Sequence, residues 1–297
     1  MHMYHIVPTC MIDCHIYDCH IYDCQNNVPF FSIGNPGCVD FYYDYLRAVF
    51  EASNGTVACI GMGHLSHHKD NLHCRKIFTL AEQVEHKQEV FAYLLETYPS
   101  TKFVVGGHSV GAYMGVELMR TFSEKILKLF CLFPTLHHIV STPNGKHMYP
   151  LLKFFTRPIS SLSLLISFLP RWTRDFIILH TQGTLSISNR AGCYSILDPI
   201  VAQNALNMGY HEMHEILDLD TDHMHNIADK LIFYCCPGDM DHWMTVEHQA
   251  DIRAICGVRS RIIICNDGSS HAFVLHASVQ VATITWTWLD AICQNNL

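Results

Sequence analysis

The pentapeptide GHSVG at residues 107–111 constrains this chain more than any other stretch of its sequence. It follows an apolar run and precedes residues 112–120, which carry apolar side chains at helical spacing. A serine at the tip of a sharp strand-to-helix turn has strained backbone angles, and only small neighbours such as Gly107 and Gly111 let the two elements pass so closely. The stretch therefore predicts a strand, a tight turn that exposes Ser109, and a helix whose N-terminus points at this serine.

Apolar runs typical of buried strands alternate with amphipathic segments along most of the chain. This alternation favours an α/β fold with a mostly parallel central sheet and helices on both faces. At 297 residues the chain has room for one large domain with an insertion, which we place at 28–297, after an N-terminal segment at 1–27. The expected strands are 28–33, 56–60, 103–106, 126–133, 230–236 and 261–265, and the clearest expected helices begin near Val39, span 79–98 and begin near Ala272.

The alternation stops after the strand expected at 126–133. Residues 148–180 are strongly apolar, and their longest uninterrupted apolar run, 159–169, is far shorter than the ~20 residues that a membrane-spanning helix needs. We therefore expect no transmembrane helix, but an apolar helical cap inserted at about 135–210. Such a cap either contacts lipid or packs wholly on the body of the domain. Residues that interrupt or flank its apolar runs are Pro150, Pro158, Pro170, Lys153, Arg157, Arg171 and Arg174.

The amino-acid composition limits the kinds of molecule that this protein is expected to bind. The chain is 49% hydrophobic and only 15% charged, with a mean hydropathy of +0.13, so part of its surface is expected to face lipid. Its net charge of −8, without a block of lysine or arginine, argues against nucleic acid as the main partner. The 14 cysteines are scattered and form no C-x-x-C pair, so we interpret them as reduced thiols.

Several histidine-rich stretches contain residue types that can bind metal ions, but none has the spacing of a standard metal-binding motif. The repeat CHIYD-CHIYD at 14–23 places its ligand types five residues apart, and residues 211–214 do not form the H-E-x-x-H motif. His67 and His68 belong to a chain with 22 histidines, most of which are expected to be structural or exposed. The sequence therefore predicts no metal and no cofactor.

Two later strand exits supply the groups that a serine nucleophile needs. A serine hydroxyl requires an imidazole to take its proton and a carboxylate to orient that imidazole. Asp241 follows the strand at 230–236, and His271 follows the last strand. Serine, acid and histidine in this chain order are typical of the α/β-hydrolase fold. Ser109, Asp241 and His271 are therefore the predicted catalytic residues.

Alternatives to two of these residues stay open. Asp239 precedes Asp241 in the same loop, although the spacing from Gly238 favours Asp241. His276 is the weaker histidine candidate.

The loop GNPG at 34–37 follows the first expected strand. In α/β-hydrolases this loop supplies one backbone N–H to the oxyanion hole, and the residue after the serine supplies another. The predicted donors are the N–H groups of Asn35 and Val110.

The sequence resembles the lipid droplet-associated hydrolases. The resemblance extends from about Val28 to near the C-terminus, and the GNPG loop together with the PNG stretch before the cap is its most specific part. The matching stretches are 34–37 with Phe41-Tyr42, 83–87, 107–113, 133–135, 141–145, 241–243 and 271–273.

This resemblance implies a serine esterase that acts on stored neutral lipid, such as cholesteryl ester or an acylglycerol. It also implies a protein that docks from the cytosolic side on lipid droplets and endoplasmic reticulum, which we expect to occur through residues 148–180. The sequence leaves two alternatives open. One is a droplet-associated binding or tethering protein with weak or no turnover, which the apolar cap favours. The other is an enzyme that uses the same catalytic residues to transfer the acyl group to an alcohol instead of water.

Overall fold

The computed structural model describes residues 27–32, 34–71 and 76–295. The predicted N-terminal segment, with its repeat at 14–23, lies outside the described residues. The division between that segment and the main domain therefore stays a prediction.

The sheet is parallel throughout and has the spatial order β2-β1-β3-β4-β5-β6. From β1 the chain first builds β2 on one side and then crosses back to β3 on the other, so the strand order reverses between β1 and β3. At such a reversal the loops that leave the two strands diverge and open a crevice at the carboxyl edge of the sheet. The strands are β1 (Asn27–Ser32), β2 (Ile60–Met62), β3 (Lys102–His108), β4 (Ile126–Leu132), β5 (Leu231–Cys235) and β6 (Arg261–Ile264).

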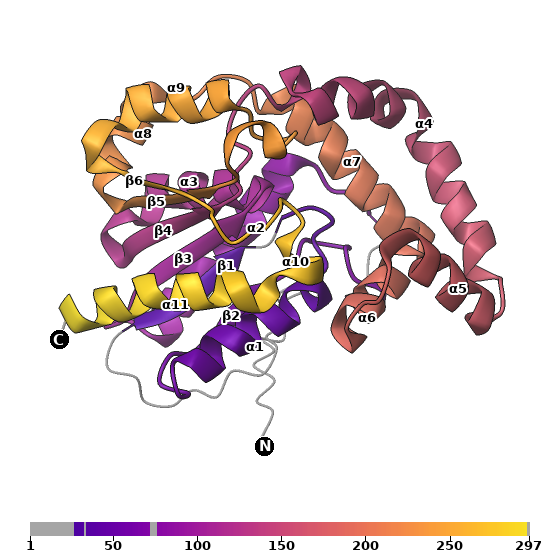
Figure 1. Cartoon of the computed structure of the whole chain (residues 1–297), viewed down its shortest axis with the longest axis horizontal. Helices are drawn as coiled ribbons and strands as arrows, with labels where there is room; N and C mark the ends of the chain where they lie inside the picture. The colour runs from indigo at the N-terminus through magenta and orange to yellow at the C-terminus, as the bar shows by residue number, and fades with distance from the viewer. Residues whose placement is uncertain (1–26, 33, 72–75, 296–297) are drawn as a thin grey trace.

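Helices cover both faces of this sheet (Figure 1). On one face, α1 (Tyr43–Ala52) and α11 (Ser278–Asn295) pack side by side. The other face carries α2 (Leu80–Thr97), α3 (Val110–Phe122), α8 (Thr221–Ile227) and α9 (Val246–Cys256). The arrangement is an α/β-hydrolase fold, as predicted.

Local sequence explains where α2 begins, ahead of β3 and the tight turn at Ser109, which we call the elbow. The Thr79 side chain accepts a hydrogen bond from the backbone N–H of Glu82, whose carboxylate in turn accepts from the N–H of Thr79. This reciprocal pair satisfies backbone donors that the first helical turn leaves open. The helix then buries Phe91 edge-on against Phe103 of β3.

Of the five α-helices between β4 and β5 in the chain, the first four, α4 to α7, form the insertion. They are α4 (Pro143–Ser167), α5 (Arg171–Gln182), α6 (Ile187–Ile196) and α7 (Pro199–Glu215). Pro150 and Pro158, which interrupt the apolar runs of the sequence, both lie inside α4, and the helix continues through them. Proline removes a backbone donor and crowds the preceding turn, which bends a helix without always ending it, and Figure 1 shows α4 bent along its length.

Side chains of α4 and α7 hold the inserted helices against the body of the fold. Leu152 of α4 and Met208 of α7 join a buried cluster with Val110 and Met114 of α3. The insertion therefore lies directly over the helix that follows the elbow.

One expected strand is corrected in its bounds. The strand expected at 56–60 is β2 at Ile60–Met62, the residues that align with Phe30–Ser32 of β1. Helix α8 begins just after Asp220, whose carboxylate accepts a hydrogen bond from the N–H of His223. Aspartate at that position is a recognisable helix N-cap.

Candidate active site

The turn between β3 and α3 has the geometry that its sequence predicts. Ser109 adopts φ 55° and ψ −125°, a strained conformation for a residue with a side chain. A Cβ on Gly107 would lie 2.2 Å from the carbonyl oxygen of Gly111, so no larger residue fits there without moving the backbone. The neighbouring helix and strand therefore hold the serine at the carboxyl edge of the sheet.

Three side chains from distant parts of the chain meet at this edge. His271, in the loop between β6 and α10 (Phe273–His276), has its Nε2 3.0 Å from Ser109 Oγ and its Nδ1 2.9 Å from Asp241 Oδ2. A carboxylate can only accept, so Nδ1 carries the proton and Nε2 is left to accept from the serine hydroxyl. Such an arrangement can draw a proton from Ser109 as its oxygen attacks an electrophile.

Asp241 is the charged member of this group and is only 2% exposed. Burial pushes the pKa of its carboxyl upward, but hydrogen bonds from His271 and from the backbone N–H groups of Trp243 and Met244 hold the pKa below its ordinary value. The N–H of Trp243 donates to Oδ1 over 2.9 Å. Both carboxylate oxygens are therefore occupied, which fixes the side chain against the imidazole.

The two alternatives differ in what the structure shows. His276 is exposed at the end of α10. Asp239 lies in the short 3-10 helix η6 (Gly238–Met240), and its side chain is outside the described part of the chain. It is Asp241 that the structure pairs with His271.

The loop after β1 packs directly on the elbow. A Cβ on Gly34 would lie 2.5 Å from the carbonyl oxygen of His108, so this glycine allows the loop and the turn to touch. The Asn35 side chain donates to the carbonyl of Ala205 in α7, which ties the loop to the inserted helices. Val110 is the first residue of α3. The oxyanion role of the Asn35 and Val110 N–H groups stays a prediction.

Sequence reasoning missed a buried hydrogen-bond chain that joins these loops. His108 Nε2 donates to the carbonyl oxygen of His271, and its Nδ1 accepts from the Tyr42 hydroxyl. The Tyr42 oxygen accepts in turn from the N–H of Gly34. Burial lowers the pKa of His108 to about 3, so its ring is neutral with the proton on Nε2. The aromatic position Tyr42 was part of the family resemblance, but only the fold shows its partner.

One group of side chains in the described residues has metal-ligand types close together. Ligand atoms of Cys38, Asp40 and His68 lie within 4.8 Å of one another. Asp40 Oδ2 is 3.4 Å from the Cys38 sulfur and 3.1 Å from His68 Nε2, which are hydrogen-bond distances for these groups. No local pattern predicts this cluster, because Asp40 and His68 are 28 residues apart in the chain.

Residues 26–274 match the family model described as lipid-droplet associated hydrolase. The lipid droplet-associated hydrolase of Mus musculus is 30% identical over 86% of this chain and 82% of its own length. The protein of that name from Homo sapiens is 28% identical over 84% of this chain and 80% of its own length, and the one from Dictyostelium discoideum is 26% identical over 86% and 85%.

Solved structures are similar in fold at low sequence identity. A serine hydrolase from Cycloclasticus zankles superposes with a TM-score of 0.63 at 14% identity, covering 91% of this chain and 92% of its own. A carboxylesterase structure from Nitrososphaera gargenis gives 0.61 at 14% identity, covering 93% of each chain. These similarities establish the fold.

Proposed function

The chain belongs to the lipid droplet-associated hydrolase family, and from this premise we propose that it is a serine ester hydrolase acting on neutral lipid at the surface of lipid droplets. The observation that carries the proposal is the contact of His271 with both Ser109 Oγ and Asp241 Oδ2, at 3.0 and 2.9 Å. In this arrangement the imidazole can take the serine proton, and the buried carboxylate orients the ring and stabilises the imidazolium that forms.

In the proposed reaction, Ser109 Oγ attacks the acyl carbonyl carbon while its proton passes to His271 Nε2. The imidazolium that forms is stabilised by Asp241 and then gives the proton to the leaving alcohol. Water, activated by the same imidazole, releases the acid from the acyl-enzyme. The N–H groups of Val110 and Asn35 hold the developing oxyanion, where the loss of one donor typically costs about 3 kcal/mol of transition-state stabilisation.

The substrate class follows from the surroundings of the site. Most of the large apolar side chains that are exposed in the described residues lie on or between helices α4 and α5, and such a concentration is unusual for a surface that faces only water. Within the described residues, no helix has both the length and the apolar character to cross a membrane. We therefore assign the surface to docking on a lipid monolayer, and the substrate to cholesteryl ester or acylglycerol. The exposed residues are Leu151, Phe154, Phe155, Leu162, Leu164, Leu165, Phe168, Leu169, Trp172, Phe176 and Leu179.

Labelling by a fluorophosphonate probe tests the nucleophile. Wild-type protein should label and hydrolyse emulsified cholesteryl ester or triacylglycerol, and Ser109→Ala should do neither while unfolding at the same temperature as wild type. Folded wild-type protein that neither labels nor hydrolyses any ester would contradict the proposal.

The exposed apolar surface also favours a second function, that of a droplet-bound or endoplasmic reticulum-bound tether with little turnover. Phe168 and Trp172 are 77% and 74% exposed, so polar substitutions there change the surface without opening the core. Phe168→Ser/Trp172→Ser should release the protein from droplets, whereas Ser109→Ala should remain bound. A tether without turnover would keep its droplet association and leave every ester substrate intact.

A further inference from the structure

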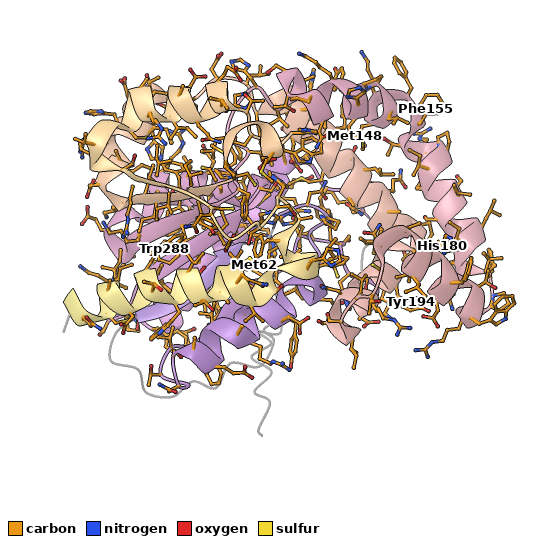
Figure 2. The ribbon with its side chains drawn as sticks, in the orientation of Figure 1. Met62, Met148, Phe155, His180, Tyr194 and Trp288 are labelled. Carbon is orange, nitrogen blue, oxygen red and sulfur yellow. The ribbon has the colours of Figure 1, made fainter. Side chains whose placement is uncertain are left out.

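A basic pocket lies between α5, α6 and the short 3-10 helix η2 (Lys69–Asn71). Its volume is about 490 Å³. Four of its lining side chains are cationic, in a chain that carries only 19 lysines and arginines and a net charge of −8. The lining residues are Lys69, Arg171, Arg174, Ile187, Arg190, Ala191 and Tyr194. Figure 2 shows Tyr194 on the inserted helices, away from Trp288 on the sheet side of the molecule.

One carboxylate, that of Asp175, partly neutralises this pocket. Asp175 accepts from Arg190 over 2.6 Å and from the Tyr194 hydroxyl over 2.7 Å. Its distance to Arg171 is 3.9 Å. Among the described residues, Lys69 and Arg174 have no carboxylate within ion-pair distance, so the pocket keeps an excess of positive charge.

Arg174 of this pocket lies against an aromatic ring and has a donor without a partner among the described residues. Its guanidinium lies 5.1 Å from the centroid of the Tyr194 ring, which fixes the group by a cation–π contact. Its Nε is buried and has no hydrogen-bond partner among the described residues. A buried guanidinium donor without an acceptor is costly, and an oxyanion is the acceptor that guanidinium groups bind most strongly.

The pocket adjoins the exposed apolar surface of α4 and α5. Arg171 and Arg174 alternate along α5 with Trp172 and Phe176, both of which are strongly exposed. When apolar side chains enter a lipid monolayer, cations at their border lie at the level of the lipid phosphates. Together the pocket and the surface have the composition expected for an anionic phospholipid bound by headgroup and chains at once.

We propose that this pocket binds the phosphate of an anionic phospholipid headgroup in the monolayer on which the protein docks. The inference rests on the proposed docking of the α4–α5 surface. Lys69 and Arg174 bind the phosphate oxygens, Arg171 lies at the rim, and Tyr194 forms the wall. The bound headgroup then fixes the rotation of α5 on the lipid surface.

Vesicle flotation with the purified full chain tests this binding. The vesicles contain phosphatidylcholine alone or phosphatidylcholine with phosphatidic acid. The pocket variant is Lys69→Gln/Arg174→Gln, which breaks no ion pair that the structure shows. The matched control is Lys102→Gln/Arg253→Gln, which removes the same charges from exposed positions on β3 and α9.

We expect phosphatidic acid to strengthen the binding of wild type and control about tenfold or more, and the pocket variant to lose most of that gain. An equal loss in pocket variant and control would overturn the proposal, since only net charge would then matter. Displacement of wild type from the acidic vesicles by inorganic phosphate or glycerol 3-phosphate at low concentration would also overturn it, because the pocket would then prefer a soluble phosphate.

Two further measurements separate this proposal from the proposed enzyme function. The pocket variant should hydrolyse a short water-soluble ester like wild type and unfold at the same temperature. Ser109→Ala should keep the preference for acidic vesicles. One outcome would separate the two proposals. If wild type hydrolyses no ester but its preference for acidic vesicles depends on Lys69 and Arg174, the headgroup site is supported and the enzyme proposal fails.

Discussion

The Nε2–H of His108 donates a hydrogen bond to the backbone carbonyl of His271 over 2.8 Å. The residue next to the candidate nucleophile thus holds the loop that carries its base. Through Tyr42, the same ring also reaches the Gly34 N–H in the loop after β1. Three loops that form the site are therefore linked by one buried hydrogen-bond chain.

Removing the Tyr42 hydroxyl should weaken this hydrogen-bond chain without removing any group that we expect to contact the substrate. In Tyr42→Phe, His108 Nδ1 and the Gly34 N–H both lose their partner in the interior, which costs about 1–3 kcal/mol per buried group. We expect the unfolding temperature to fall, and kcat for a soluble ester to drop about tenfold with little change in KM, because misplaced catalytic groups mainly lose rate.

Tyr45→Phe is the control for that variant. Tyr45 is also fully buried, but its hydroxyl bonds to Thr285 Oγ1 on α11, away from the loops of the site. It should lower stability while leaving kcat per folded molecule unchanged. If both variants reduce kcat alike, Tyr42 has no positioning role of its own.

Asp241→Asn should abolish most turnover while preserving the fold. An amide in place of the carboxylate can hold the imidazole in the wrong tautomer, and the corresponding change in a serine protease lowers kcat by about 10⁴. Comparison with Asp239→Asn by steady-state kinetics checks the assignment. Equal losses in the two variants would mean that Asp241 is not the orienting acid.

Gly107→Ala should destabilise the elbow severely. The added Cβ would lie 2.2 Å from the Gly111 carbonyl oxygen, a backbone atom that cannot move aside as a flexible side chain could. We expect a loss of at least about 4 kcal/mol in the free energy of unfolding, or insoluble protein. Gly183→Ala, at a positive φ but with open space around its Cβ, should cost only about 1–3 kcal/mol in chemical denaturation.

Glu212 of α7 should make the stability of the protein depend on pH. Burial raises the pKa of its carboxyl from 4.5 to about 8, and its Oε1 has no hydrogen-bond partner among the described residues. Between these two pKa values the unfolded chain is ionised while the folded protein keeps the proton. Folding therefore takes up a proton, and the contribution of this group to stability falls as pH rises through that window.

Glu212→Gln removes this titration with little change in shape. Its unfolding temperature relative to wild type should therefore increase from about pH 5 to about pH 9. Glu85→Gln, at an exposed position on α2, serves as the control. A difference between Glu212→Gln and wild type that stays constant across this range would show that Glu212 is not protonated in the folded protein.

The sequence alone determined the parts of this protein that depend on local chemistry. Glycines around Ser109 specify the elbow, Thr79 and Glu82 specify the start of α2, and the alternation of apolar and amphipathic segments specifies a parallel sheet. The order in which serine, aspartate and histidine follow their strands also indicated which three side chains meet. These features are set by residues near one another in sequence or by a repeating pattern.

Only the tertiary structure decided which groups lie together across the loops. Nothing local to Tyr42, His108 or Gly34 indicates that they form one hydrogen-bond chain, and Lys69 is about a hundred residues from the arginines of its pocket. That α4 continues through Pro150 and Pro158 also depends on tertiary structure, since packing against α7 offsets the local cost of lost backbone hydrogen bonds. Contacts between distant residues depend on how whole elements pack, and local sequence does not encode that packing directly.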